Sequence, residues 1–414
     1  MSYKTINFII DKFTGYNISQ GVINALEFDF LSRDEIYQYQ QQKFQELSQI
    51  ASQSEYYKNF CNKPLKDFPL IDRVEYQANI ERMKTNYNHP YHIGESSGST
   101  GHPVNQYVTK DMLQAKRVSH QKMLRWYGLN RESPEFKLGG LKCSFKTNVY
   151  HYLRNKRYFD SYTITEMTLK KITRLYNRFK PKVLYGYPSA INKFLMFAKS
   201  HNIKLFHPAI VVTHAENLYK EFENNYRNFF PDSKIVNQYW STEANIAETC
   251  PDGSLHIDED TVICEIINAD ENGYGDLYIT NLFSYIVPII RYKIGDRVKI
   301  SDKTCSCGRN TKIIDSIEGR EYEYLELRDG DRFPLTAIDV KDFIENIGYY
   351  QLVYYKNDKK ILFKYKPIKN EIPIKKEIII SYMKDKFGLY TEFEQVSDTE
   401  LSPGGKLKRL IVID

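Results

Sequence analysis

The sequence predicts a large α/β domain with mixed and parallel sheets over residues 1–319, followed by a small α+β domain over residues 320–414. Helix and strand patterns alternate with short connections between residues 166 and 239, an order typical of a parallel sheet covered by helices. After residue 250 the turn residues indicate antiparallel strands, and the last part of the chain has its own hairpins and helices.

Hydrophobic periodicity predicts the elements of the large domain in order. The segment 34–51 reads as a polar amphipathic helix with Ile36 and Leu47 on or near one face, and a second helix is predicted over 110–126. The alternating part then predicts a helix at 166–179, a strand at 182–187, a helix from Pro188, a strand at 209–213, a helix at 216–229 and a strand at 234–239.

Turn residues locate the hairpins of both domains. Asn272-Gly273 predicts a tight turn between two antiparallel strands, and Asp329-Gly330 predicts another at the start of the small domain. The rest of the small domain reads as a helix at 335–346, strands at 351–356 and 360–366, a helix at 371–386 and a strand near 391–396.

Length and composition exclude several classes of protein. With 414 residues, 42% of them hydrophobic and 27% charged, the chain is not disordered, collagen-like or a coiled coil. The formal charge of +6 is small and the two signs are interspersed, so we expect no nucleic-acid partner. No segment approaches the roughly 18 to 20 apolar residues of a transmembrane helix, and the N-terminus lacks a signal-peptide cleavage site. We therefore expect a cytoplasmic protein.

The stretch from Glu95 to Pro103 has the composition of an anion-binding loop. Its two glycines let the backbone approach a phosphate closely, and its Ser and Thr residues add hydroxyl donors to the backbone N–H groups. It is not a Walker-type loop, because no Gly-Lys-Ser/Thr follows at the required spacing. Taken alone, a solvated surface loop explains the stretch equally well.

A second candidate site, Tyr239-Trp240-Ser241-Thr242-Glu243, directly follows a predicted parallel strand. Ligands of open α/β sheets bind at the carboxyl ends of strands. There an aromatic ring can stack on a base, a threonine can bind phosphate, and a glutamate can hold a hard cation such as Mg²⁺. The alternative is an ordinary strand end with a capping Ser or Thr.

Two weaker candidates lie further along the chain. Asp296 follows a predicted turn at Gly295, where an acidic residue could hold ribose hydroxyls. Lys406 follows Gly404-Gly405 and could deliver a positive charge to a closing active site. An ordinary turn and a basic tail are the alternatives.

The candidate sites described above, taken together in their order along the chain, resemble the adenylate-forming superfamily. Within it they resemble the phenylacetate–CoA ligase-like family and its capsular-polysaccharide-biosynthesis branch. The resemblance covers roughly residues 94–410 and implies the adenylate-forming enzyme fold with a mobile C-terminal domain. Its motifs are SSGSTGHP, YGYPSA (185–190), THAE (213–216), YWSTE (239–243), GDLYITNLFSYIVPIIRYKIGD (275–296), IEGRE (317–321) and GGKLKR (404–409).

The resemblance implies an ATP site with Mg²⁺. The residues that would grip the β- and γ-phosphates are Ser97, Gly98, Ser99, Thr100 and Gly101. The remaining nucleotide would meet Ala215 and Glu216 beside adenine, Tyr239 stacked on it, Asp296 at the ribose and Thr242 at the α-phosphate. Glu243 would hold Mg²⁺, and Lys406 would bridge the substrate carboxylate and the α-phosphate.

The resemblance also implies an acyl pocket and a hinge. The pocket wall would include Tyr185, Tyr187, Pro188 and Ser189. The small domain would rotate near Arg320, which is also assigned to the nucleotide site. The sequence departs from the family pattern at three positions, where His102, Ile294 and Gly404 replace the usual Lys, Thr and Ser or Thr.

Four residues form a candidate metal site. Cys305-Ser306-Cys307 is a Cys-x-Cys knuckle, and Cys250 and His256 lie upstream, six residues apart. A Cys₃His set is typical of tetrahedral structural zinc; reduced cysteines without a metal are the alternative. The resemblance favours zinc, because family members often carry such a site with this layout. The remaining cysteines, Cys61, Cys143 and Cys264, are expected to be core thiols.

The expected activity is the ATP-dependent, AMP-forming activation of a small-molecule carboxylate, followed by transfer of the acyl group to an acceptor. CoA is the expected acceptor, and surface polysaccharide biosynthesis is a possible setting. The alternatives are an amide ligase that joins a carboxylate, such as a uronic acid, to an amine, and a non-catalytic nucleotide-binding scaffold. The sequence does not predict the acid or the oligomeric state.

Overall fold

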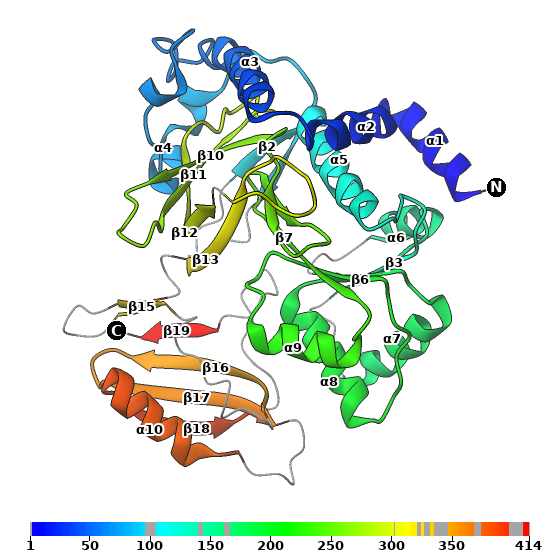
Figure 1. Ribbon diagram of the computed structural model, residues 1–414, viewed down its shortest axis with the longest axis vertical. Helices are drawn as coiled ribbons and strands as arrows, with labels where there is room; N and C mark the ends of the chain where they lie inside the picture. The colour runs from blue at the N-terminus through cyan, green and yellow to red at the C-terminus, as the bar shows by residue number, and fades with distance from the viewer. Residues whose placement is uncertain are drawn as a thin grey trace. The chain divides into compact units, whose positions relative to one another are not determined.

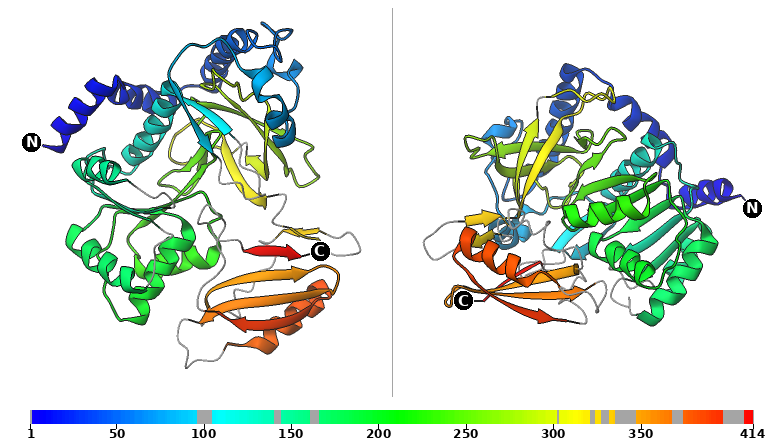
Figure 2. Two further views of the ribbon diagram at one scale, coloured as in Figure 1. Left: turned by 180° about the vertical axis from the view of Figure 1, so that it is seen from behind. Right: turned by 60° about the horizontal axis from the view of Figure 1, so that its bottom comes forward.

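The computed structural model describes residues 2–95, 105–139, 144–160, 166–301, 303–320, 324–326, 332–334, 347–367, 374–396 and 409–413. The chain forms two compact units (Figures 1 and 2). Unit 1 consists of Met1–Ser133, Leu153–Asn155 and Val236–Glu318. Unit 2 consists of Pro134–Tyr152, Lys156–Ile235 and Gly319–Asp414.

The helices of unit 1 lie in its N-terminal part. They are α1 (Tyr3–Thr14), α2 (Ile18–Phe28), α3 (Arg33–Ala51), α4 (Arg73–Met83) and α5 (Lys110–Trp126), with a short 3₁₀ helix at Leu65–Asp67. A capping box starts α3, because the Ser32 side chain accepts from the Glu35 N–H and Glu35 bonds back to the Ser32 N–H. The predicted helices at 34–51 and 110–126 are confirmed as α3 and α5, whereas α1, α2 and α4 were not predicted.

The strands of unit 1 are mostly antiparallel. Strands β1 (Tyr91–Glu95) and β2 (Asn105–Thr109) pair with each other. The first strands of the 11-stranded sheet run in the order β10 (Val262–Ile267), β11 (Gly275–Asn281), β12 (Tyr292–Ser301), β13 (Ile313–Arg320), β9 (Leu255–Ile257), β8 (Asn245–Thr249) and β7 (Lys234–Trp240). The turn predicted at Asn272-Gly273 joins the antiparallel strands β10 and β11, and Gly273 takes φ +83° there.

Unit 2 contains the predicted parallel sheet. Its strands β6 (Ile210–His214), β5 (Val183–Gly186), β3 (Glu135–Gly139) and β4 (Lys156–Asp160) are neighbours in this order, and each pair is parallel. Helices α7 (Glu166–Phe179), α8 (Pro188–Ser200) and α9 (Lys220–Phe229) share one buried core with β3, β5 and β6. A further helix, α6 (Phe145–Leu153), lies between β3 and β4 in the chain.

The C-terminal part of unit 2 has its own sheet, ordered β18 (Tyr390–Gln395), β17 (Lys360–Pro367), β16 (Ile347–Tyr355) and β19 (Leu410–Ile413). Helix α10 (Lys376–Phe387) packs its Ile379, Met383 and Phe387 into the same core (Figure 1). Strands β14 (Tyr324–Glu326) and β15 (Arg332–Pro334) flank the predicted Asp329-Gly330 turn. The helix predicted at 335–346 lies outside the described residues, and the domain boundary at 319/320 stays a prediction.

Gly186 occupies a point where two strands of the parallel sheet approach too closely for a side chain. It pairs with Leu138 of β3, and an added Cβ would lie inside the van der Waals distance of the Leu138 carbonyl oxygen. This position lies within the YGYPSA motif, which therefore has a packing role as well as any functional one.

Gly186→Ala should destabilise the protein by about 1–3 kcal/mol, because either the backbone of β3 or that of β5 must move. Urea unfolding measures the change. Gly94→Ala is the matched control, since its Cβ would meet Val108 Cγ2 at an ordinary 3.6 Å. Equal stability of the two variants would contradict the close approach.

Candidate functional site

The turn that follows β7 in unit 1 is built around the hydroxyl of Ser241. Its Oγ accepts hydrogen bonds from the N–H groups of Glu243 and Ala244, both at 3.1 Å. The Ser241 N–H in turn donates to the Ala244 carbonyl at 2.9 Å. A serine with local bonds of this kind is typical of turns, so Ser241 shapes the turn that presents Thr242 and Glu243.

Glu243 is half-buried, and two distant elements contact it. The Asn281 side-chain amide at the end of β11 donates to the Glu243 carbonyl at 2.6 Å. The Tyr292 hydroxyl at the start of β12 lies 3.5 Å from Glu243 Oε1, the outer limit of a hydrogen bond. Burial raises the pKa of Tyr292, and the charge of Glu243 adds to that effect. Tyr292 therefore stays a neutral donor beside the carboxylate.

Lys116 of α5 also reaches this turn, and no sequence pattern predicts it. Its Nζ donates to the Thr242 carbonyl at 2.8 Å. Burial lowers the pKa of the Lys116 ammonium to about 8, and the negative charge of Glu243 acts in the opposite direction. The carboxylate of Glu243 is therefore close enough to the ammonium group of Lys116 to stabilise the charged form of the lysine.

Tyr239 and Asp296, both assigned to the nucleotide by the resemblance, are direct partners. The Tyr239 hydroxyl donates a hydrogen bond to Asp296 Oδ2. Asp296 is only 4% exposed, and it follows Gly295, whose φ of +90° favours glycine. The structure therefore brings the expected base-stacking and ribose-binding residues together from within two strands, β7 and β12; Gly295, where a turn was predicted, lies inside β12.

In unit 2 the loop after β6 has an unusual backbone. Ala215 takes φ +63°, in the left-handed region that residues other than glycine rarely adopt. The next residue, Glu216, accepts two hydrogen bonds at 2.9 Å, one from the N–H and one from the hydroxyl of Ser189 at the start of α8. Such strained residues cluster at functional sites, so the outlier supports a role for this loop.

Two of the predicted acyl-pocket residues, Tyr185 and Tyr187, pack their rings against one histidine. The rings of Tyr185 and Tyr187 lie 4.4 Å and 5.1 Å from the His214 ring, between centroids. Lys137 places its Nζ 4.2 Å from the Tyr185 ring centre, and the Pro188 carbonyl accepts from the Tyr226 hydroxyl at 2.6 Å. The structure gathers these residues at the carboxyl ends of β5 and β6; their role in acid binding stays a prediction.

Several predicted site residues lie outside the described part of the chain. These are Ser97, Gly98, Ser99, Thr100, Gly101, His102 and Lys406. Arg320 is described only as the last backbone position of β13. The strands β1 and β2, which flank the phosphate loop in sequence, pair in register from Tyr91 with Thr109 to Glu95 with Asn105.

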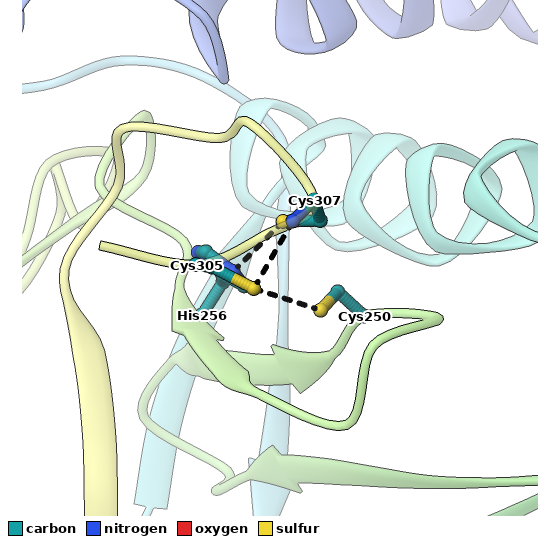
Figure 3. A group of neighbouring side chains, drawn as sticks. All are labelled: Cys250, His256, Cys305 and Cys307. Atoms are coloured by element: carbon teal, nitrogen blue, oxygen red, sulfur yellow. Dashed lines mark hydrogen bonds between the residues drawn. The ribbon is translucent and has the colours of Figure 1, made fainter. Parts of the chain in front are cut away.

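The structure brings the four predicted metal ligands together in unit 1 (Figure 3). The ligand atoms of Cys250, His256, Cys305 and Cys307 all lie within 4.8 Å of one another. Cys250 Sγ is 3.7 Å from Cys305 Sγ, and Cys307 Sγ is 3.3 Å from His256 Nε2. The two segments that carry the ligands lie 49 to 57 residues apart in sequence, so only the fold completes the group.

These distances fit a tetrahedral zinc ion. Zn–S bonds of about 2.3 Å and Zn–N bonds of about 2.0 Å place two sulfurs about 3.8 Å apart and a sulfur about 3.5 Å from a nitrogen. His256 bonds to Thr311 through Nδ1, at 2.9 Å to the hydroxyl, which leaves Nε2 directed to the group. Burial would raise the pKa of the Cys305 thiol, but its hydrogen bonds with the Ser254 hydroxyl and the Cys307 amide lower the pKa to about 6.

The prediction that the other three cysteines are core thiols is wrong for Cys61, which is exposed. It lies in a turn after α3, where no strand or helix pattern buries it. Cys264 on β10 is half-buried at the edge of the main core of unit 1. Cys143 lies outside the described residues.

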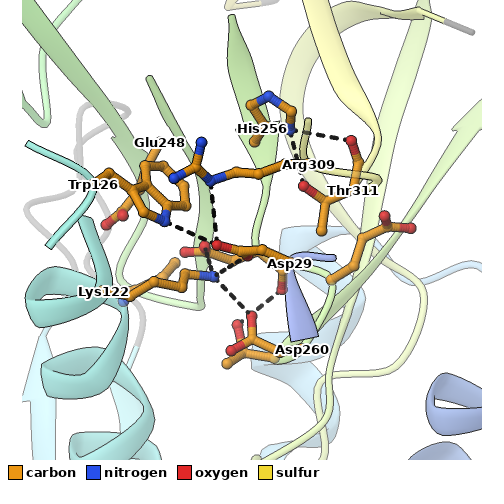
Figure 4. A network of polar contacts seen from close by, with 12 residues as sticks. Asp29, Lys122, Trp126, Glu248, His256, Asp260, Arg309 and Thr311 are labelled. Carbon is orange, nitrogen blue, oxygen red and sulfur yellow. Dashed lines mark hydrogen bonds and ion pairs between the residues drawn. The ribbon is translucent and has the colours of Figure 1, made fainter. Parts of the chain in front are cut away.

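A buried network of charges adjoins the cysteine–histidine group (Figure 4). The Lys122 ammonium of α5 lies 2.9 Å from Asp258, 3.2 Å from Asp260 and 3.5 Å from Asp29. Asp29 also accepts from the Trp126 indole at 2.8 Å and pairs with Arg309 at 3.3 Å.

The network is linked covalently to the metal ligands. Glu248, Asp258 and Arg309 each lie two residues from one ligand, namely Cys250, His256 and Cys307. The packing of α5 and the arrangement of the ligands are therefore connected through the chain. No sequence pattern predicted this network, because its members come from five separate segments.

The fold is that of the adenylate-forming CoA ligases. The chain matches a structure of 2-hydroxyisobutyryl-CoA ligase in the postadenylation state in complex with 2-HIB-AMP with a TM-score of 0.74. The match covers 93% of this chain and 91% of the other, at 13% identity. ATP-bound MatB from Rhodopseudomonas palustris matches with a TM-score of 0.52 over 76% of this chain and 66% of that one, at 14% identity. These likenesses confirm the predicted adenylate-forming fold.

Among proteins compared by sequence, the chain is similar to Protein CapK of Staphylococcus aureus. The two are 25% identical over 402 residues, which is 90% of this chain and 88% of the relative. No family model matches the chain. Within the described residues, no helix has the length and apolar character that crossing a membrane requires.

We expect the purified protein to contain one zinc ion per chain and Cys305→Ser to lose it, measured by elemental analysis. The melting temperature should fall as well, because structural zinc in small sites binds with an apparent ~10–16 kcal/mol. Cys61→Ser is the matched control, since this cysteine is exposed and outside the group. A Cys305→Ser variant that keeps both its zinc and its melting temperature would refute the site.

Proposed function

We propose that this protein activates a small carboxylic acid with ATP to an acyl-adenylate and transfers the acyl group to CoA. The observation that carries the proposal is the fold, which the chain shares over 93% of its length with a CoA ligase in the postadenylation state. The turn at Thr242 and Glu243 and the Tyr239–Asp296 pair support it, because they supply the residue types that phosphate, a cation, a base and a ribose require.

In the first half-reaction a carboxylate oxygen of the acid attacks the α-phosphorus of ATP. The bond from that phosphorus to the bridging oxygen breaks, and pyrophosphate leaves. Two anions must approach each other, so catalysis here depends on position and on neutralising charge. Thr242 would donate to the α-phosphate, Asp296 and Tyr239 would orient the nucleoside, and Lys406 would contact both reacting groups.

The residues present are also suited to Mg²⁺. Glu243 offers a half-buried carboxylate, the hard oxygen ligand that Mg²⁺ prefers, together with substrate phosphates. When bound, the ion would neutralise charge on the phosphates. Fixing the position of this carboxylate is then the task of the chain itself, through Ser241 and Asn281.

In the second half-reaction the acceptor attacks the acyl carbon and AMP leaves. For CoA the attacking atom is the thiol sulfur, whose proton is lost, and the product is a thioester. An amide ligase is the second candidate, with an amine as the attacking group. A non-catalytic scaffold is the third, and the His102 position is its best support. A setting in surface polysaccharide biosynthesis and a cytoplasmic location stay predictions.

We further propose a structural role for zinc and a mobile role for the small domain. Three thiols and one imidazole would fill a tetrahedral ion completely, leaving no open position for a substrate. The small domain, taken as residues 320–414, would deliver Lys406 for adenylation and rotate near Arg320 to admit the acceptor.

A first test measures pyrophosphate and AMP release from Mg-ATP with a panel of carboxylic acids, with and without CoA. We expect release that depends on an acid and disappears in Glu243→Ala. A dependence on CoA for AMP release distinguishes thioester from amide formation, which would need an amine instead. The absence of release with every acid, despite ATP binding, would favour the scaffold.

Lys406→Ala should lower the rate of adenylation by a factor on the order of 10²–10³, the cost of losing one preorganised charge at a reacting centre. Pre-steady-state release of pyrophosphate with the best acid of the panel measures this rate. Lys408→Ala, two residues along the same segment, is the matched control. An unchanged rate in Lys406→Ala would refute the assigned role.

A further inference from the structure

Glu243 lies between two peptide groups. In each of them both the carbonyl oxygen and the N–H group make a hydrogen bond to a side chain. In the peptide between Thr242 and Glu243, the carbonyl accepts from Lys116 Nζ at 2.8 Å and the N–H donates to Ser241 Oγ at 3.1 Å. In the peptide between Glu243 and Ala244, the carbonyl accepts from the Asn281 amide at 2.6 Å and the N–H donates to Ser241 Oγ at 3.1 Å.

This arrangement fixes the direction of the Cα–Cβ bond of Glu243, from which its carboxylate extends. A peptide group is planar, so holding its oxygen and its N–H fixes the whole plane. The two planes on either side of a residue together set its φ and ψ, and hence where its Cβ projects. Ser241 accepts from the N–H group of each peptide. Lys116 of α5 and Asn281 of β11 donate to the two carbonyl oxygens.

Lys116 differs from the other two because it is charged. A hydrogen bond with an ionised donor is roughly twice as strong as a neutral one. Burial of an ammonium is unfavourable, and burial lowers the pKa of this one to about 8. Its position beside Thr242 is therefore kept at a cost in desolvation, which a role in packing alone does not explain.

We infer that Lys116 is a positioning residue for Glu243: its ammonium holds the peptide between Thr242 and Glu243 so that the carboxylate is oriented toward the cation that accompanies ATP. This rests on the proposed function, in which Glu243 binds Mg²⁺. Lys116 is not assigned a contact with substrate; it acts through the backbone of the turn.

The test compares ATP binding with Mg²⁺ and with EDTA, by isothermal titration calorimetry, and so needs no knowledge of the acid. Lys116→Met should reduce the gain in ATP affinity that Mg²⁺ gives by about 10-fold, the worth of one hydrogen bond to a charged group. ATP binding in EDTA should change by less than about 3-fold, and the melting temperature should be unchanged.

Two further variants separate positioning from packing. Lys116→Arg keeps the charge and the donors and should restore the Mg²⁺-dependent gain. Lys110→Met removes an exposed lysine from the start of the same helix and should behave as the unmodified protein. The inference is overturned if Lys116→Met retains the full gain, or if it weakens ATP binding equally in EDTA and Lys116→Arg fails to restore it.

Glu243→Ala distinguishes this inference from the proposed function. If Glu243→Ala loses the Mg²⁺-dependent gain and Lys116→Met does not, the inference alone fails. If Glu243→Ala retains the gain, the proposed cation site is wrong and the inference fails with it.

Discussion

The burial of the Lys122 ammonium among three aspartates is the constraint on which the rest of unit 1 depends. The side chain of Lys122 is 1% exposed, and those of Asp29 and Asp258 are equally buried. Removing such charges from water is costly and is offset only by good geometry. Removing one member of the network would leave the remaining buried charges without their partner, which is strongly destabilising.

Helix α5 connects this network to the candidate site, because it carries both Lys122 and Lys116. Lys122 fixes the helix against the segment after α2 and the loop before β10, and Lys116 lies about 1.7 turns earlier on the same helix. A rigid helix transmits its position over such a distance, so the network, the cysteine–histidine group and the Thr242–Glu243 turn are parts of one connected assembly. Thr242 and Glu243 then lie on the turn after β7, at a strand end, where α/β sheets commonly bind ligands.

Much of the secondary structure could be predicted because its signals are local. The helix that begins at Pro188 and the strand at 182–187 follow from periodicity and from proline at the first helical position. The grouping of Cys250, His256, Cys305 and Cys307 was also predicted, because their layout resembles the zinc site that members of the family often carry. The helices α1, α2 and α4 were not predicted; α4 has a weak amphipathic pattern, whereas the patterns of α1 and α2 are stronger than that of α3. Cys61 was predicted wrongly, because a single cysteine carries no periodic signal that separates a buried position from an exposed one.

The sequence by itself determined the types and the order of the chemical groups: the strand-end motifs, the Cys₃His set and the alternation that gives a parallel sheet. Only the tertiary structure decided that Lys116 and Asn281 hold the peptides around Glu243, that Tyr239 bonds to Asp296, and that Lys122 is surrounded by acids. The physical reason is range. Periodicity and turn chemistry act over a few residues, whereas these contacts join segments from 38 to 138 residues apart, which meet only when the chain is folded.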